Sequence, residues 1–217
     1  KSTLLQLLAG MQDPQTGTVS LDDISLPLLD VADVRRDMAF LSQNARLFFG
    51  SVRENITMGR PLASDDDIQR ALAMSGALEF VRQQKNGLNY QILEGGFGLS
   101  GGQRQALLLA RMLITQPNIV LMDEPTAWLD EISEQRLIGH LEQWIGRRTL
   151  VIATHRLAIL HLVDRIIVLD KGKVVMDGPR DVILKQQRPA EAAKPAQTVR
   201  RATLNRTAAD SSKEETL

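Results

Sequence analysis

The sequence predicts an α/β fold with a mainly parallel β-sheet, and two patterns carry this prediction. Three short segments, 38–41, 118–122 and 149–153, are largely apolar throughout, as expected for strands that are buried on both faces. Segments with helical patterns separate these strands, an arrangement typical of a parallel sheet covered by helices. The stretch 51–116 breaks this alternation because its pattern is helical, so we expect it to form an inserted helical lobe.

The other elements follow from periodicity and from residues that begin or end helices. Ser64 precedes three aspartates and is expected to cap a helix, because acidic residues favour a helix N-terminus. Pro117 ends a long helix, and Asp170-Lys171-Gly172 forms the turn of a hairpin. In chain order we predict a helix over 2–10, a strand over 17–21, helices beginning at Ser51 and Ser64, helices over 101–116 and 131–144, hairpin strands over 165–169 and 173–176, and a helix over 181–186.

Composition limits the classes of protein that the chain can represent. Of its 217 residues 43% are hydrophobic, which is enough for a substantial core. Lys and Arg number 26 and so do Asp and Glu, a balance that argues against a nucleic-acid partner, since nucleic-acid binding needs excess positive charge. The absence of cysteine excludes disulfides and thiolate metal sites. No run of about 18 apolar residues occurs, so no membrane-spanning helix is predicted.

The domain organisation follows from a change in composition near the C-terminus. We assign residues 1–187 to one domain, with the helical lobe at about 51–116. After Gln187 the chain is rich in Ala, Thr, Pro and charged residues and has few large apolar groups, so we expect residues 188–217 to form a disordered tail. The first residue is Lys1 rather than Met, and we therefore expect the chain to be a fragment or a processed product.

Two motifs are typical of phosphate chemistry. Lys1-Ser2-Thr3 before an apolar helix matches the end of a phosphate-binding loop, in which Lys contacts the β- and γ-phosphates and the next hydroxyl binds Mg²⁺. Taken alone, these residues are also typical of an ordinary helix N-cap. The apolar strand 118–122 delivers Asp123 and Glu124 to its carboxyl end, where open α/β sheets bind ligands. Asp123 would hold Mg²⁺ through water and Glu124 would act as a general base, although two solvated carboxylates remain the alternative.

A third motif, Leu99-Ser100-Gly101-Gly102-Gln103, opens the long helix over 101–116. Its glycines allow the backbone to approach an anion closely, and the helix N-terminus carries partial positive charge. Ser100 adds a hydroxyl donor. The motif is therefore a candidate phosphate contact, and the sequence QRQALLLARML that follows argues against a simple glycine-rich cap.

These motifs resemble those of the ATP-binding cassette (ABC) family of transporters. LSGGQRQ is similar to the signature motif, IVLMDEPT to the Walker B segment, and Lys1-Ser2-Thr3 to the end of the Walker A loop. Gln43 is similar to the Q-loop glutamine, residues 127–130 to the D-loop, and His155 to the switch histidine. The six elements occur in the family's order over residues 1 to about 185, which makes coincidence negligible.

The resemblance implies a P-loop NTPase (RecA-like) core that binds and hydrolyses ATP with Mg²⁺, in two cassettes paired head to tail. The implied catalytic residues are Glu124, His155 and Gln43, and the implied Mg²⁺ ligands are Ser2, Gln43 and Asp123. The implied nucleotide contacts are Lys1, Ser2 and Thr3, with Ser100, Gly101 and Gly102 acting on the nucleotide of the partner cassette, and with Gln103 and Asp130.

Within the family, the segment 47–56 (LFFGSVRENI) and the loop Glu94-Gly95-Gly96 resemble the exporter type, including bacterial type I protein secretion and related peptide or lipid exporters. The resemblance implies a motor domain that drives transport of a protein, peptide or lipid. It also implies a transmembrane domain fused upstream and a position at the cytoplasmic face of the inner membrane. An importer-type subunit and a catalytically inactive ABC fragment are the alternatives.

The chain departs from the family pattern in two places. The glycines of Walker A and the aromatic that stacks on adenine would precede Lys1, so we expect the chain to be truncated within Walker A. Backbone N–H groups of that loop supply most of the phosphate donors, and we therefore expect the chain alone to be inactive. In the D-loop, Ala127 replaces the usual Ser and Trp128 replaces a small residue.

Overall fold

The computed structural model describes residues 1–187, and these form the α/β fold that the sequence predicts. The expected tail, 188–217, lies outside the described residues. The elements are α1 (Ser2–Leu8), β1 (Ser20–Leu21), β2 (Ile24–Ser25), α2 (Val31–Asp37), β3 (Met38–Leu41), β4 (Gly50–Ser51), α3 (Val52–Thr57), α4 (Asp65–Ser75), α5 (Leu78–Gln83), β5 (Gln91–Ile92), α6 (Gly101–Leu113), β6 (Ile119–Asp123), α7 (Glu131–Ile145), β7 (Thr149–Ala153), β8 (Arg165–Asp170), β9 (Lys173–Pro179) and α8 (Arg180–Gln187).

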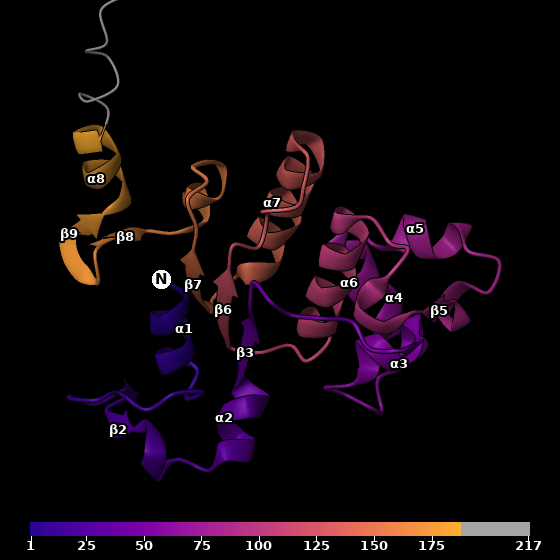
Figure 1. Ribbon diagram of the computed structural model, residues 1–217, viewed down its shortest axis with the longest axis horizontal. Coiled ribbons are helices and arrows are strands. Elements are labelled where there is room, and N and C mark those ends of the chain that lie inside the picture. The colour runs from indigo at the N-terminus through magenta and orange to yellow at the C-terminus, as the bar shows by residue number, and fades with distance from the viewer. Residues whose placement is uncertain (188–217) are drawn as a thin grey trace, which may run out of the picture.

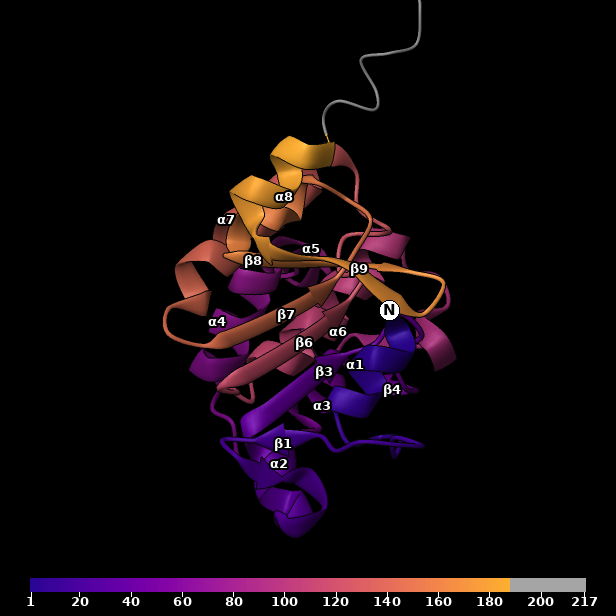
Figure 2. The same ribbon diagram turned by 90° about the vertical axis from the view of Figure 1, so that its left-hand side faces the viewer.

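The central sheet has the strand order β3-β6-β7, and both of its ladders are parallel. The register pairs Leu41 with Met122 and Asp123 with Ala153. The carboxyl ends of the strands consequently lie at one edge of the sheet (Figure 2). The central strand β6 is the most buried of the three, and its residues Val120 to Met122 are almost wholly inaccessible to solvent. Burial on both faces explains why this strand is a continuous apolar run.

Helices cover both faces of this sheet. Helix α1 packs against β6 on one face, while α6 packs against β3 from the other side (Figures 1 and 2). Leu107, Leu109 and Ala110 on α6 are fully buried in the main hydrophobic cluster. The hairpin of β8 and β9 forms a separate antiparallel sheet with α8 packed against it.

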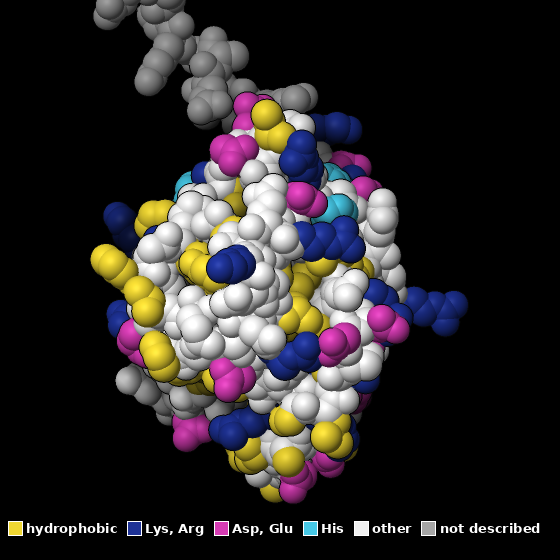
Figure 3. Space-filling model, turned by 90° about the vertical axis from the view of Figure 1, so that its right-hand side faces the viewer, with side chains coloured by type: hydrophobic (Ala, Val, Ile, Leu, Met, Phe, Trp, Pro, Cys, Tyr) yellow, Lys and Arg dark blue, Asp and Glu magenta, His cyan; other side chains and the backbone are white. Residues whose placement is uncertain are grey.

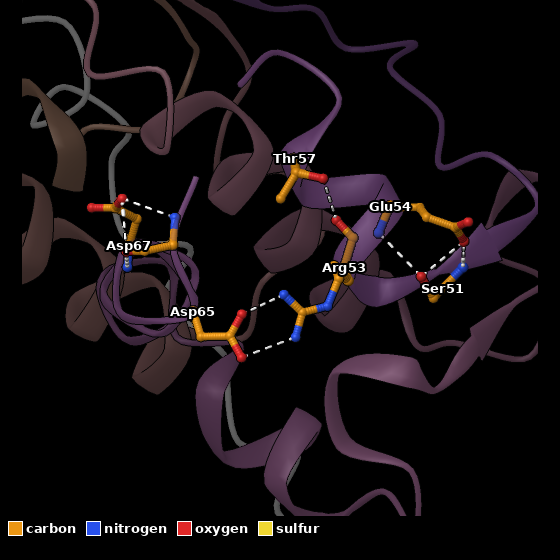
Figure 4. A network of polar contacts seen from close by, with 7 residues as sticks. Ser51, Arg53, Glu54, Thr57, Asp65 and Asp67 are labelled. Atoms are coloured by element: carbon orange, nitrogen blue, oxygen red, sulfur yellow. Dashed lines mark hydrogen bonds and ion pairs between the residues drawn. The ribbon is translucent and has the colours of Figure 1, made fainter. Parts of the chain in front are cut away.

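The helical lobe lies to one side of the sheet and contains α3, α4, α5 and α6 (Figure 1). Ser51, Ser64 and Ser100 each form a capping box, which satisfies free N–H groups at the start of α3, α4 and α6. An ion pair between Arg53 on α3 and Asp65 on α4 joins two of these helices (Figure 4). The domain limits 1–187 and 51–116 stay predictions.

The structure differs from the predicted elements in a few places. The lobe also contains the two-residue strands β4 and β5, which are paired antiparallel and are too short to give a sequence pattern. Helix α2 was not predicted: it has only seven residues, and none of them is buried. Helix α6 ends at Leu113 rather than 116, because Gln116 has a left-handed φ of 51° just before Pro117.

Candidate functional site

The backbone after β6 turns sharply and holds Glu124 at the carboxyl edge of the sheet. Asp123, the last residue of β6, is buried with 3% of its surface exposed. Glu124 follows with a φ of 51°, a left-handed conformation that is uncommon for residues other than Gly. Its N–H donates a hydrogen bond of 2.8 Å to the carbonyl of Ala153. The last residue of β7 thereby fixes this turn, and such backbone strain is concentrated at functional sites.

The Glu124 carboxylate has partners on the loop that follows β7. Its Oε1 lies 2.8 Å from Nδ1 of His155, and its Oε2 accepts a 3.2 Å hydrogen bond from Oγ1 of Thr154. The Glu124 side chain is only 13% exposed, whereas that of His155 is 68% exposed. Two neighbouring residues therefore orient one carboxylate, and the imidazole extends beyond it toward solvent. A carboxylate held this way is suited to accept a proton from a water molecule.

The ammonium group of Lys1 lies at the same edge of the sheet. Nζ of Lys1 donates a 2.7 Å hydrogen bond to the carbonyl of Thr154. Lys1 is the N-cap of α1, so Ser2 and Thr3 stand in the first turn of that helix. Figure 1 shows the N-terminus beside β7. The structure thus brings Lys1, Glu124 and His155 together at the loop that follows β7.

The glycine-rich motif forms the start of α6. Ser100 is the N-cap: its Oγ accepts from the Gln103 N–H at 3.1 Å, and its own N–H donates to Oε1 of Gln103 at 2.9 Å. Gly101 packs against Trp128, whose Cβ would lie 3.2 Å from a Cβ added at that glycine. This surface opens onto a hollow of about 710 Å³. Its walls include Ser100, Gly101, Gly102, Gln103, Asp130 and Trp128.

The remaining predicted residues lie near this second group. Gln43 follows β3 and lines a smaller hollow of about 230 Å³ together with Gly101 and Trp128. Asp130 caps α7, and the hydrogen bonds that it accepts from the Ser133 N–H and hydroxyl lower the pKa of its carboxyl group. The carboxylate of Asp130 is therefore used within its own loop.

The predicted residues fall into two groups, one around the Glu124 carboxylate and one at the start of α6. One group holds Lys1, Glu124 and His155, and the other holds 100–103 with Gln43 and Asp130. Among residues 1–187 no hydrogen bond or ion pair joins the two groups. Sequence reasoning missed Thr154, which bonds to Glu124, although a hydroxyl at the end of a buried strand could have indicated it.

The predicted Mg²⁺ ligands do not form a cluster of acidic or imidazole side chains. The described part of the chain contains no group of three or more His, Cys, Asp or Glu side chains that could hold a metal ion. The predicted ligands Ser2, Gln43 and Asp123 would offer hydroxyl, amide and carboxylate oxygens. Such hard oxygen donors suit Mg²⁺, which usually combines one or two carboxylates with phosphate oxygens. The chemistry of this set therefore fits Mg²⁺ that binds together with a nucleotide.

Comparison with known proteins identifies the family. The sequence profile of the family described as "ABC transporter" matches residues 1–127, more than half of the chain. The chain belongs to the ABC transporter family, a nucleotide-binding family with a P-loop α/β core. Within residues 1–187, no helix has the length and apolar character needed to cross a membrane.

Several relatives have names that describe export or translocation. A putative export ATP-binding/permease protein of Rickettsia felis is 35% identical over 85% of this chain and 32% of its own length. The alpha-hemolysin translocation ATP-binding protein HlyB of Escherichia coli is 36% identical over 86% of this chain and 26% of its own length. A solved structure of a bacterial Atm1-family ABC exporter with ATP bound aligns with a TM-score of 0.82 and 28% identity, over 91% of this chain and 36% of that one. The chain spans about a third or less of the length of these relatives.

Proposed function

We propose that this chain is the ATP-binding and ATP-hydrolysing motor domain of an ABC exporter. The observation that carries the proposal is the Glu124 carboxylate, held by His155 and Thr154 at the same sheet edge as the ammonium of Lys1. A cation there can bind phosphate oxygens, and an oriented carboxylate beside it can activate water. These are the groups that phosphoryl transfer to water requires.

In the proposed reaction Glu124 accepts a proton from the water that attacks the γ-phosphate. His155 holds this carboxylate through Nδ1 and leaves its exposed ring edge free to reach the phosphate. Lys1 binds the β- and γ-phosphate oxygens, and Ser2 and Thr3 add donors at the start of α1. Ser2, Gln43 and Asp123 would hold Mg²⁺, which neutralises charge on the phosphates. ADP and phosphate are the products.

The proposed partner is a second cassette, paired head to tail. In the described part of the chain no hydrogen bond or ion pair joins the group 100–103 to Glu124 or His155, so this group is free to act on the nucleotide of a partner. The N-terminus of the 13-residue helix α6 is suited to bind an anion. We propose that Ser100, Gly101 and Gly102 close the partner's site and that Gln103 and Asp130 support this surface.

A transmembrane domain is the second proposed partner. The two exporter-type segments lie side by side: the Phe49 N–H donates to Oε2 of Glu94 at 3.2 Å, and the Gly95 N–H donates to the carbonyl of Leu47 at 3.0 Å. Exposed hydrophobic side chains occur on the face of the helical lobe (Figure 3), and Phe49 and Phe97 are 69% and 76% exposed. We propose that this surface contacts the membrane domain of the full-length exporter at the cytoplasmic face of the membrane. The cargo would be a protein, peptide or lipid.

Mixing two defective variants tests whether each ATP site is formed by residues of two chains. Full-length protein with Ser100→Arg should retain Lys1 and Glu124 but lose the surface that closes the partner's site. Protein with Lys1→Ala should retain the surface around Ser100 but lose the ammonium group that binds phosphate. We expect each variant alone to lack ATP hydrolysis and a mixture to recover up to about half of the wild-type rate per active heterodimer. A mixture that is no more active than either variant alone would contradict the head-to-tail site.

A further inference from the structure

Arg156 makes an unusual set of contacts one residue after His155. Its Nη1 lies 2.9 Å from Oε2 of Glu134 on α7 and 3.5 Å from the carbonyl of Leu129. Its Nη2 donates to the carbonyl of Ala127 at 3.3 Å. One guanidinium therefore joins the loop after β7 to α7 and to the loop 126–130.

The burial of Glu134 strengthens its ion pair with Arg156. The Glu134 side chain is only 8% exposed, and its Oε1 has no hydrogen-bond partner in the described part of the chain. A buried carboxylate without a cation nearby is strongly disfavoured, because desolvation of the charge is not compensated. Arg156 supplies that cation, so the pairing anchors the guanidinium above the two loop carbonyls.

Arg156 is also linked to Glu124. The Arg156 N–H donates to Oγ1 of Thr154 at 3.0 Å, and the same hydroxyl donates to Oε2 of Glu124 at 3.2 Å. A hydroxyl that accepts one hydrogen bond and donates another is fixed in direction. Movement of the Arg156 backbone would therefore change the orientation of the Glu124 carboxylate.

We propose that Arg156 is a positioning residue for the proposed hydrolysis reaction, on whose correctness this inference rests. Its guanidinium holds the loop 126–130 and the Thr154–His155 segment as one unit. The Glu124 carboxylate then keeps a fixed position relative to the surface around Trp128 and Asp130. Nucleotide binding does not depend on Arg156, whereas the rate of the chemical step does.

The geometry requires Arg rather than any cation. The planar guanidinium reaches one carboxylate and two carbonyls at once, while the ammonium of Lys is a single compact centre. Arg156→Lys retains a positive charge for Glu134 and so retains most of the stability. The Lys side chain cannot keep all three contacts. The variant therefore disturbs the position of the loop while the fold stays stable.

Trp128 reports on the loop directly. The sequence has two tryptophans, Trp128 in the loop and Trp144, which is only 9% exposed. With Trp144→Phe as background in the 217-residue chain, fluorescence anisotropy measures the mobility of Trp128 alone. We expect lower anisotropy in Arg156→Lys and in Arg156→Met/Glu134→Leu, a pair that removes both charges and so spares the fold. Arg180→Ala is the control, because Arg180 likewise donates to backbone carbonyls, those of His161 and Val163, and should leave the anisotropy unchanged.

Kinetics of the full-length protein complete the test. We expect Arg156→Lys to lower kcat on the order of 10- to 100-fold, as small misplacements in active sites do, with KM for ATP unchanged. Wild-type anisotropy in Arg156→Lys, or wild-type kcat in the Arg156→Met/Glu134→Leu pair, would overturn the inference. If wild-type protein does not hydrolyse ATP, the proposed function fails instead, and the anisotropy then decides whether Arg156 holds the loop.

Discussion

Glu124 and His155 stand 31 positions apart in the sequence, yet Oε1 of the carboxylate lies 2.8 Å from Nδ1 of the imidazole. The parallel pairing of β6 and β7 produces this contact, because each residue follows the carboxyl end of its strand. The contact supports the proposed roles, in which the largely buried Glu124 carboxylate acts as the base and the exposed imidazole orients it.

Removing the groups that orient Glu124 should slow hydrolysis to different extents. His155→Ala removes the 2.8 Å partner and the ring edge, and we expect kcat to fall by about 100-fold or more. Thr154→Val removes only the 3.2 Å hydrogen bond, so we expect a loss of about tenfold or less. Steady-state kinetics of the full-length protein measure both. Equal losses for the two variants would argue against the orienting role of His155.

The stability of the helical lobe should fall at acidic pH. The guanidinium of Arg70 and then the hydroxyl of Ser64 hold the pKa of Asp67 at about 2, below its ordinary value of 3.8. A carboxyl group with a lowered pKa in the folded state stabilises the fold above its unfolded pKa. This contribution is therefore complete above about pH 5 and is lost as the pH falls from about 4 to 2.

Urea unfolding of Asp67→Asn and wild type at several pH values checks this. We expect wild type to be more stable at pH 6 and the difference to shrink toward pH 2. Asp66→Asn, in the same helical turn, is the control for simple loss of charge. A wild-type advantage that stays constant from pH 6 to pH 2 would mean that the Asp67 carboxylate does not cap α4 as described.

The two glycines at the start of α6 should respond differently to alanine. Ala normally stabilises a helix by about 0.5–1 kcal/mol relative to Gly. At Gly102 a new Cβ would lie 3.5 Å from Leu129, an ordinary contact, so we expect Gly102→Ala to gain up to this amount. At Gly101 the Cβ would lie 3.2 Å from the Cβ of Trp128, so the loop must move and the gain should vanish. Urea unfolding measures both, and equal gains would show that Trp128 does not pack on Gly101.

The elements that the sequence predicted well are those with a strong local pattern. Strand β7 has the predicted bounds 149–153, because its apolar run ends abruptly at Thr154. Ser64 caps α4 as predicted, and α3 starts directly after Ser51, where a helix was expected to begin, since capping depends on a few adjacent residues. Helix α2 has only seven residues and none of them is buried, so it is too short to show a clear helical periodicity.

The sequence indicated the residues of the candidate site one by one, but it could not predict their spatial arrangement. The resemblance indicated Glu124 and His155, yet their contact depends on the register of β6 against β7, which a single sequence does not fix. The roles of Thr154 and Arg156 depend largely on their contacts with Glu124 and Glu134, which are 30 and 22 positions away. Such long-range hydrogen bonds leave no periodic trace in the sequence.

Nucleotide turnover in Glu124→Gln tests the central claim most directly. Gln keeps the size of the side chain but cannot accept a proton as a carboxylate does, so hydrolysis should stop while ATP binding persists. In full-length protein we expect kcat to fall by about 100-fold or more, with ATP affinity within about twofold of wild type. Glu131→Gln, at the exposed start of α7, is the control and should keep wild-type turnover. Turnover within about twofold of wild type in Glu124→Gln would contradict its role as the general base.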